Sequence, residues 1–175
     1  MDNIQFPELT TERLLLRRLK RSDWPVVSYL RSDATVNQFV KRSNAPSKEL
    51  AIEFIERAND SIDKHDLFQW CIVERNNDQM IGSICLWNFS EDRQTAEVGY
   101  DLSPAWHSKG IMTEALTHVL EFGFNNLGLE KIEAYTQWNN ERSRRLLERN
   151  GFSLIEDKID DQNRDNLVYE IKASS

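Results

Sequence analysis

The sequence has 175 residues, of which 39% are hydrophobic and 29% are charged, as is typical of a folded globular chain. The formal net charge of −7 disfavours attraction to nucleic-acid backbones and suits a cationic partner such as an amine. No apolar run is long enough to span a membrane, and residues 1–8 lack the basic start and apolar run of a signal peptide. We therefore expect one cytoplasmic domain over residues 1–175, with no nucleic-acid or membrane partner.

The first third of the chain predicts one strand followed by helices. Apolar residues at 14–16 lie between two arginines, a pattern typical of a short buried strand. Capping residues at 22–23 and again at 32–33 predict two brief helices, the second of which gives way to a polar loop. A longer helix is expected over 47–65, because apolar residues recur there at helical spacing after a serine cap.

The middle of the chain predicts a meander of three antiparallel strands. Alternating patterns run over 68–74, 80–87 and 95–102, with turn-forming residues between them. Cys71 and Cys85 fall inside the first two runs and have no metal-ligand spacing. We therefore expect two small buried side chains and no metal site.

The third of these strands leads into a turn that suits an anion. The strand ends at Pro104, and a polar, glycine-containing turn follows at 107–110. After the turn, the sequence can sustain a helix through Glu121 or beyond. The first N–H groups of a helix have no internal partner and lie at the positive end of its dipole, so this turn predicts a phosphate site.

The last third predicts a strand, a helix and a closing hairpin. Residues 131–136 form the strand, and Asn139 or Asn140 then caps a helix that ends at an Asn-Gly pair. Runs at 152–155 and 167–171 predict two paired strands joined by a polar loop. The element order indicates an α+β (mixed α/β) fold, with antiparallel strands first and one strand-helix-strand crossover in the middle.

Six short stretches occur in a recognisable order along nearly the whole chain. They are Leu9–Arg17, Ile81–Ser83, Ala96–Leu102, Trp106–Ala115, Asn139–Ser143 and Asn150–Phe152. Together they resemble the GNAT superfamily of acetyl-coenzyme A-dependent N-acetyltransferases, and most of all its RimJ/RimL-like branch, which acetylates ribosomal-protein N-termini. The resemblance implies the GNAT fold: a mostly antiparallel mixed sheet of six to seven strands with flanking helices and a β-α-β core that binds acetyl-CoA.

The resemblance also implies a set of cofactor-binding residues. The turn would hold the pyrophosphate through backbone N–H groups, with Lys109 adding charge. Asn139 would bond the pantetheine arm and Ser143 would protonate the leaving thiolate, although their spacing also fits a helix cap and an early polar residue. His107 and Met112 depart from the family's usual Gln or Arg and Gly or Ala. The implied set is Leu102, His107, Ser108, Lys109, Gly110, Ile111, Met112, Thr113, Asn139 and Ser143.

Two carboxylates compete for the role of general base. An alkylammonium with a pKa of about 10 must lose a proton, and Glu97 matches the acidic residue that serves this branch, usually through water. Asp101 lies on the same face of an ideal strand, and a bulge would change which of the two carboxylates faces the acceptor. Together with Asp101, we expect Phe39 and Trp87 to line the acceptor site, since a water-poor wall lowers the pKa of a bound ammonium.

The implied reaction is acetyl transfer to a primary amine by direct attack in a ternary complex, without a metal. The acceptor stays open between protein N-termini, polyamines and aminoglycoside-like amines, because acceptor specificity resides in loops. The alternative from another class is a non-catalytic CoA-binding regulatory module, against which the presence of both Glu97 and Ser143 argues. A homodimer is compatible with the sequence but is not predicted by any pattern in it.

Overall fold

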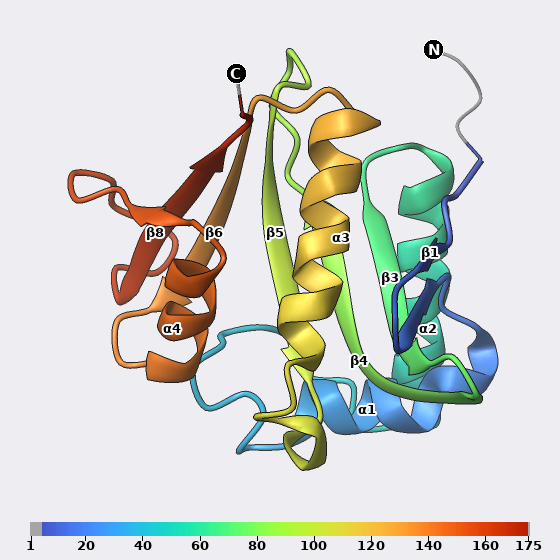
Figure 1. Cartoon of the computed structure of the whole chain (residues 1–175). Coiled ribbons are helices and arrows are strands. Elements are labelled where there is room, and N and C mark those ends of the chain that lie inside the picture. Colours follow the sequence, from blue (N-terminus) through green and yellow to red (C-terminus); the bar gives the residue numbers. More distant parts are fainter. Residues whose placement is uncertain (1–4, 175) are drawn as a thin grey trace.

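The structure, a computed structural model, describes residues 5–174, so that residues 1–4 of the N-terminal segment and Ser175 lie outside the description. The strands are β1 (Leu9–Thr10), β2 (Leu14–Arg17), β3 (Phe68–Glu74), β4 (Asn77–Trp87), β5 (Thr95–Leu102), β6 (Lys131–Gln137), β7 (Ser153–Leu154) and β8 (Asn166–Lys172). The helices are α1 (Trp24–Ser32), α2 (Lys48–Asp63), α3 (Ile111–Asn125) and α4 (Glu141–Arg149), with 3₁₀ turns at Arg21–Asp23 and Pro104–Trp106. The strands form one sheet in the order β1-β2-β3-β4-β5-β6-β8-β7 (Figure 1).

The predicted meander and crossover are confirmed, and two other expectations are corrected. Strands β3, β4 and β5 pair antiparallel, and β5 and β6 are the parallel pair that α3 connects. The sheet has eight strands rather than six to seven, because β1 pairs with β2 over only two residues, too few to show alternation. Residues 34–39 form turns rather than a second brief helix. The Asp33 side chain there accepts hydrogen bonds from the N–H groups of Thr35 and Val36, an arrangement that competes with helix.

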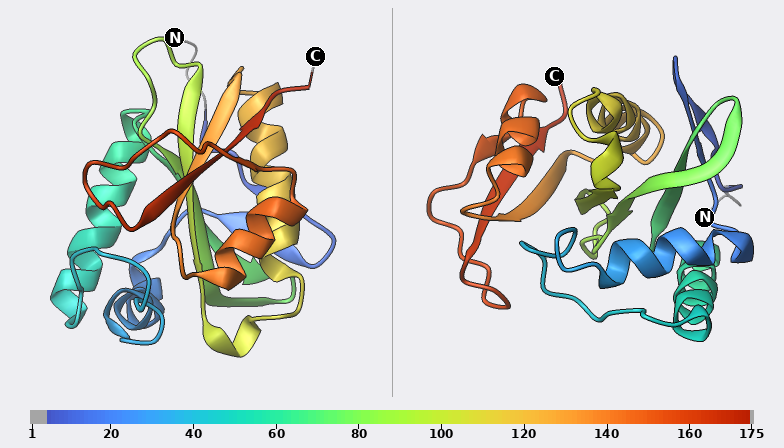
Figure 2. Two further views of the ribbon diagram at one scale, coloured as in Figure 1. Left: turned by 90° about the vertical axis from the view of Figure 1, so that its left-hand side faces the viewer. Right: turned by 90° about the horizontal axis from the view of Figure 1, so that it is seen from below.

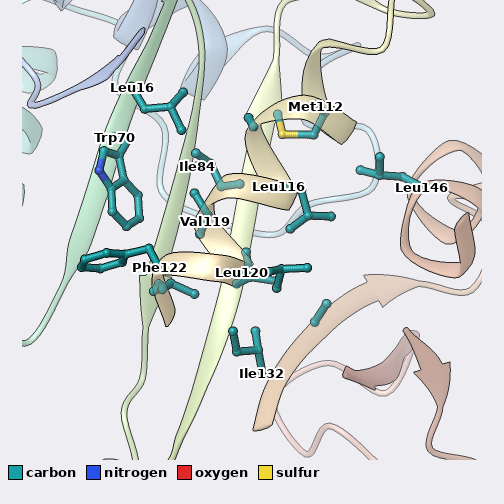
Figure 3. Close-up of a cluster of buried hydrophobic side chains, with 14 of the residues drawn as sticks. Leu16, Trp70, Ile84, Met112, Leu116, Val119, Leu120, Phe122, Ile132 and Leu146 are labelled. Atoms are coloured by element: carbon teal, nitrogen blue, oxygen red, sulfur yellow. The ribbon is translucent and has the colours of Figure 1, made fainter. Parts of the chain in front are cut away.

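Helices cover both faces of the sheet. The helices α3 and α4 lie on one face, and α1 and α2 lie on the other (Figure 2). Successive side chains of β3 point to opposite faces of the sheet. Trp70 points into the core under α3, whereas Cys71 packs with α1 and α2. Trp70 meets Phe122 of α3 edge to face, with ring centroids 5.5 Å apart (Figure 3). Within residues 5–174, no helix is both long enough and apolar enough to cross a membrane.

The sheet opens in its middle, between β5 and β6. The parallel ladder between these strands ends where Val98 lies opposite Ala134. Beyond this point β5 continues to Leu102 beside β4, and β6 continues beside β8, so the two strands diverge (Figure 1). The backbone of residues 99–102 therefore has no partner strand on its β6 side. This opening positions the candidate site.

Candidate active site

A cleft of about 2220 Å³ runs through the opening between β5 and β6. It extends from the N-terminus of α3 across the sheet to residues 35–42, and to residues 159–163 in the loop before β8. The predicted site residues that line it are Phe39, Trp87, Glu97, Asp101, Leu102, His107, Ser108, Gly110, Ile111, Met112, Thr113, Asn139 and Ser143. Lys109 is absent from this lining. The cleft therefore joins the predicted phosphate turn, the two candidate catalytic residues and the expected acceptor wall.

The turn before α3 has the backbone geometry that an anion requires. Ser108 and Gly110 both adopt left-handed conformations, with φ of 62° and 73°. The Gly110 carbonyl accepts the N–H of Glu114 at 3.1 Å, which begins the helical ladder. The N–H groups of residues 111–113 precede that ladder and lie at the positive end of the helix dipole. Since a glycine adopts a left-handed conformation without steric cost, Gly110 permits the turn that exposes them.

Residues from the start of the chain hold this turn in place. Arg13 of the β1–β2 connection donates from Nη1 to the Lys109 carbonyl at 2.9 Å and from Nε to Glu114 Oε1 at 2.9 Å. The Thr11 hydroxyl and the Arg13 N–H also donate to the Glu114 carboxylate. Burial would raise the pKa of Glu114, but these bonds outweigh it and lower the pKa. Sequence reasoning missed this role, because no local pattern pairs residues about a hundred positions apart.

Two side chains of the turn have local partners. The His107 Nε2–H donates to the Leu102 carbonyl at 3.1 Å, so the ring joins the turn to the end of β5. Burial and the nearby Arg142 lower the pKa of His107, which favours the neutral ring. The Lys109 ammonium lies 5.0 Å from the centre of the Trp106 ring. Besides Arg13, a second arginine reaches the turn: Arg142 of α4 donates to the Ser108 hydroxyl at 3.3 Å.

Glu97 lies on the face of β5 that points toward α1 and α2, because its two sequence neighbours are buried beneath α3. Its Oε2 accepts a long hydrogen bond, 3.4 Å, from the side chain of Asn88. Burial raises the pKa of Glu97 to about 7, against the opposing bond from Asn88, and the Asp160 carboxylate adds to the rise. A carboxyl group with this pKa exchanges protons near neutral pH, as a general base must.

Asp101 shares this face of β5 but is already paired. The β4–β5 ladder continues without a bulge from Glu97 to Leu102, so both carboxylates point the same way. Asp101 Oδ2 accepts from Arg42 Nη1 at 3.1 Å, and Oδ1 accepts from the Ser83 hydroxyl at 2.7 Å. Both of its oxygens therefore stabilise the fold around the cleft, whereas Glu97 has only the long contact with Asn88.

Ser143 lies in the first turn of α4, on the opposite side of the opening. Its N–H donates to the Asn140 side chain at 3.2 Å, so the helix cap is Asn140, while Asn139 is exposed in the preceding turn. The Ser143 hydroxyl lies 2.6 Å from the hydroxyl of Tyr100, which packs against the core under α3. Burial raises the pKa of Tyr100 to about 12, so the phenol stays protonated. We did not predict Tyr100 as a site residue, because alternation marks it only as an apolar position of β5.

The wall of the cleft on the α1 and α2 side carries aromatic and sulfur atoms. Trp87 is 44% exposed, and Phe39 is partly buried in the turn segment after α1. A Cβ on Gly99 would lie 3.2 Å from Cys85 Sγ and 3.8 Å from Trp87 Nε1, so these residues border the open space above Gly99. Cys71 is buried as expected, but Cys85 is partly exposed and lines the cleft. Burial raises the pKa of both thiols, that of Cys85 to about 12.

A family model described as an acetyltransferase (GNAT) domain matches residues 13–153. The chain belongs to the GNAT acetyltransferase family. It is 31% identical over 147 residues to the uncharacterized N-acetyltransferase YoaA of Bacillus subtilis, covering 84% of this chain and 83% of that one. It is 27% identical over 141 residues to spermidine N(1)-acetyltransferase of Escherichia coli, with coverage of 79% and 72%. The ribosomal-protein-S5-alanine acetyltransferase from Vibrio fischeri has a similar fold, with a TM-score of 0.79 at 20% identity over 95% of this chain and 96% of that one.

This GNAT chain is an acetyl-CoA-dependent N-acetyltransferase, which confirms the family, fold class and activity implied by the sequence resemblance. Its residues fit an extended thioester carrier with a phosphate-rich end. The free N–H groups at the start of α3 suit the phosphates, and the unpaired backbone of residues 99–102 suits an extended arm. Among residues 5–174, no group of three or more His, Cys, Asp or Glu side chains could hold a metal ion.

Proposed function

We propose that the GNAT chain acetylates a primary amine by direct attack in a ternary complex, with Glu97 as general base and Ser143 as the proton donor to the leaving thiolate. The observation that carries this proposal is the placement of the two side chains on either side of the opening. Glu97 faces the α1 and α2 side, with a pKa raised to about 7 by burial. Ser143 lies on the α3 and α4 side, bonded to Tyr100.

Acetyl-CoA supplies the activated acetyl group and a thiol leaving group. We assign its pyrophosphate to the N–H groups of residues 111–113 and to the turn at Ser108 and Gly110, with Arg142 as the nearby cation. We assign its extended arm to the backbone of residues 99–102, with Asn139 at the rim of the cleft. His107 serves this site by fixing the turn to β5, since its ring is bonded to a carbonyl.

The amine needs a group that removes its proton close to neutral pH. A carboxyl with a pKa of about 7 is substantially ionised at that pH and is far more basic than an ordinary glutamate. Glu97 accepts the amine proton, directly or through one water, as the new amide forms. The indole of Trp87 lines this wall, and contact with an apolar surface would lower the pKa of a bound ammonium.

The departing sulfur needs a proton or a hydrogen bond. The Ser143 hydroxyl is held at 2.6 Å from Tyr100 and lies at the N-terminus of α4, where a helix dipole stabilises negative charge. Cys71 is buried, and burial raises the pKa of the Cys85 thiol that lines the cleft, which disfavours a nucleophilic thiolate there. This supports direct transfer from thioester to amine.

We further propose a protein N-terminus as the acceptor, with a small polyamine as the second candidate. The fold is shared with a ribosomal-protein-S5-alanine acetyltransferase, which supports the first, and a relative named spermidine N(1)-acetyltransferase supports the second. The exposed Trp87 and the turns at 35–42 give the cleft a wide mouth, which suits a peptide chain.

The test is a CoA-release assay with N-terminal peptides and polyamines as acceptors, with products identified by mass spectrometry. Wild type is expected to release CoA and form one acetylated product, while Glu97→Gln and Ser143→Ala are expected to be slow. Equal rates in all three proteins would exclude these residue roles. Thermal stabilisation by acetyl-CoA without turnover of any amine would instead indicate a non-catalytic module.

A further inference from the structure

Two arginines enter the cleft from its α1 side, but they differ in how completely they are bonded. Arg42 donates to Asp101 from Nη1 at 3.1 Å, to the Asn37 side chain from Nε at 2.8 Å and to the Leu30 carbonyl from Nη2 at 2.8 Å. All three nitrogens of its guanidinium are thus engaged. Arg42 therefore fastens the loop after α1 to β5 and has little left to offer a ligand.

Arg31, at the C-terminal end of α1, is engaged far less. Its guanidinium makes one hydrogen bond, from Nη2 to the Ser43 carbonyl at 3.2 Å, and stacks 4.1 Å from the centre of the Phe54 ring. No carboxylate of residues 5–174 lies within the 4.0 Å of an ion pair with it. Since a guanidinium carries five N–H donors and stacking occupies only its face, most donors at its edge stay available to a ligand.

The surroundings of Arg31 favour an anion. Burial lowers the pKa of Arg31 to about 10, and the positive charge of Arg42 adds to the effect, so the guanidinium is still protonated near neutral pH. The Asp101 carboxylate acts in the opposite direction and raises the pKa of Arg31, but both of its oxygens are already bonded, one to Arg42 and one to Ser83. Two cations, Arg42 and Arg57, thus act on Arg31 against the single carboxylate of Asp101, so its surroundings are locally positive. An oxyanion would relieve that imbalance.

The position of Arg31 relates it to the proposed base. Glu97 and Asp101 lie on one face of β5, four residues and so about 13 Å apart along the strand. Arg31 and Arg42 are grouped around Asp101, whereas Glu97 lies at the other end of this row. An acceptor with its amine at Glu97 and an anion at Arg31 would thus have to span on the order of 13 Å, the length of about four extended residues.

We propose that Arg31 is an oxyanion subsite, and that the preferred acceptor is a peptide N-terminus carrying a carboxylate or phosphate on its third or fourth residue. This rests on the proposed acetyl transfer at Glu97. The subsite contributes affinity and orientation rather than chemistry, so its effect falls on KM more than on kcat. An acidic residue and a phosphorylated serine at these peptide positions share this chemistry.

The experiment compares matched tetrapeptide amides with and without the anion: Ala-Ala-Asp-Ala against Ala-Ala-Asn-Ala, Ala-Ala-Ala-Asp against Ala-Ala-Ala-Asn, and phosphoserine against serine at the fourth position. Wild type is expected to favour at least one anionic member by about tenfold in kcat/KM, mainly through KM. Arg31→Gln should remove that preference while acting normally on the neutral members, and Arg31→Lys should retain part of it. The pair with the largest ratio identifies the source of the anion. Arg21→Gln, on an exposed arginine outside the cleft, is the control.

Equal kcat/KM for both members of every pair in wild type, or a preference that survives Arg31→Gln, would overturn the subsite. Failure of the proposed function would look different, with no CoA released from any amine, charged or neutral. Calorimetric titration of the N-acetylated Ala-Ala-Ala-Asp amide into wild type and Arg31→Gln tests the subsite without turnover, and equal affinities would refute it. The melting shift with acetyl-CoA verifies that each variant is folded.

Discussion

The hydroxyl oxygens of Tyr100 and Ser143 lie 2.6 Å apart and join β5 to the first turn of α4 across the opening in the sheet. Burial raises the pKa of Tyr100 to about 12, so the phenol remains protonated. A phenol is a better hydrogen-bond donor than an aliphatic alcohol, so Tyr100 is expected to donate to Ser143. The Ser143 hydrogen is then free to point into the cleft, which makes Tyr100 a positioning residue.

Removing the Tyr100 hydroxyl is expected to slow the reaction by misdirecting Ser143. Tyr100→Phe should lower kcat about tenfold with little change in KM, and Ser143→Ala should lower it on the order of 10²-fold. Because the two residues act as a unit, the double variant should be no slower than Ser143→Ala alone. Steady-state kinetics of wild type, the two single variants and the double variant measures this coupling. Independent, multiplying effects would show that the contact serves packing only.

The pH dependence of the reaction is expected to report Glu97. With a pKa of about 7, the carboxylate is ionised above neutral pH, so kcat/KM of wild type should rise with pH through about 7 and then level off. Glu97→Gln should be slower by 10²–10⁴-fold and should lose this inflection. Asp101→Asn is the matched control and should keep it. An unchanged inflection in Glu97→Gln would assign the titration to another group.

The same glutamate is expected to make stability depend on pH. Its pKa is raised from 4.5 to about 7 in the folded state, so between these values the folded chain holds a proton that the unfolded chain has lost. The free energy of unfolding of wild type should therefore fall, through Glu97, as pH rises from about 4.5 to 7. Glu97→Gln has no proton to lose at this position, so it should melt higher than wild type at pH 8, and the difference should vanish near pH 4. Thermal unfolding at several pH values measures this, and a lower melting temperature at pH 8 would contradict it.

Arg13 is expected to matter for acetyl-CoA rather than for the acetyl transfer step. Arg13→Gln removes the side-chain bonds to the Lys109 carbonyl and to Glu114, while the bonds to Glu114 from the Thr11 hydroxyl and the Arg13 N–H remain. We expect KM for acetyl-CoA to rise about tenfold with kcat nearly unchanged, because the phosphate turn loses part of its support. The exposed Arg21, with Arg21→Gln, serves as the control. A fall in kcat at unchanged KM would mean that the turn instead positions the acetyl group.

Gly82 is expected to be required for the close packing of β4 against β5. A Cβ there would lie 2.5 Å from the Asp101 carbonyl oxygen, so Gly82→Ala must push β4 away from β5. The free energy of unfolding should fall by about 1–3 kcal/mol in urea titrations. Gly99→Ala is the matched control on the neighbouring strand, because its Cβ would meet only side-chain atoms, the nearest being Cys85 Sγ at 3.2 Å. Equal losses in both variants would show that the close approach to the Asp101 carbonyl is not the cause.

Local patterns predicted most of the fold. Alternation over 95–102 gave β5 its correct bounds, and Ser47 caps α2 as expected, with Leu50 N–H donating to its hydroxyl. The two wrong expectations, the number of strands and the second brief helix, also have local causes. The β1 strand is too short for a pattern, and the Asp33 side chain bonds the backbone that a helix would have used.

The site was predicted only as far as the family motifs reach. Alternation could not separate Glu97 from Asp101, because both face α1 and α2; their partners, Asn88 for one and Arg42 with Ser83 for the other, distinguish them. Those partners come from other elements and leave no trace in the local sequence. Tyr100 was missed for the same reason, since it lies 43 residues from Ser143 along the chain.

The divergence of β5 and β6 at Val98 gives this sheet a pair of inner edges. Unpaired strand edges recruit extended chains from other proteins and so promote aggregation, a hazard that most sheets confine to their outer rims. At the proposed site, an extended co-substrate arm in the gap would cover those edges as a strand does. Depletion of acetyl-CoA would then stop catalysis and, at the same moment, expose two unpaired strand edges.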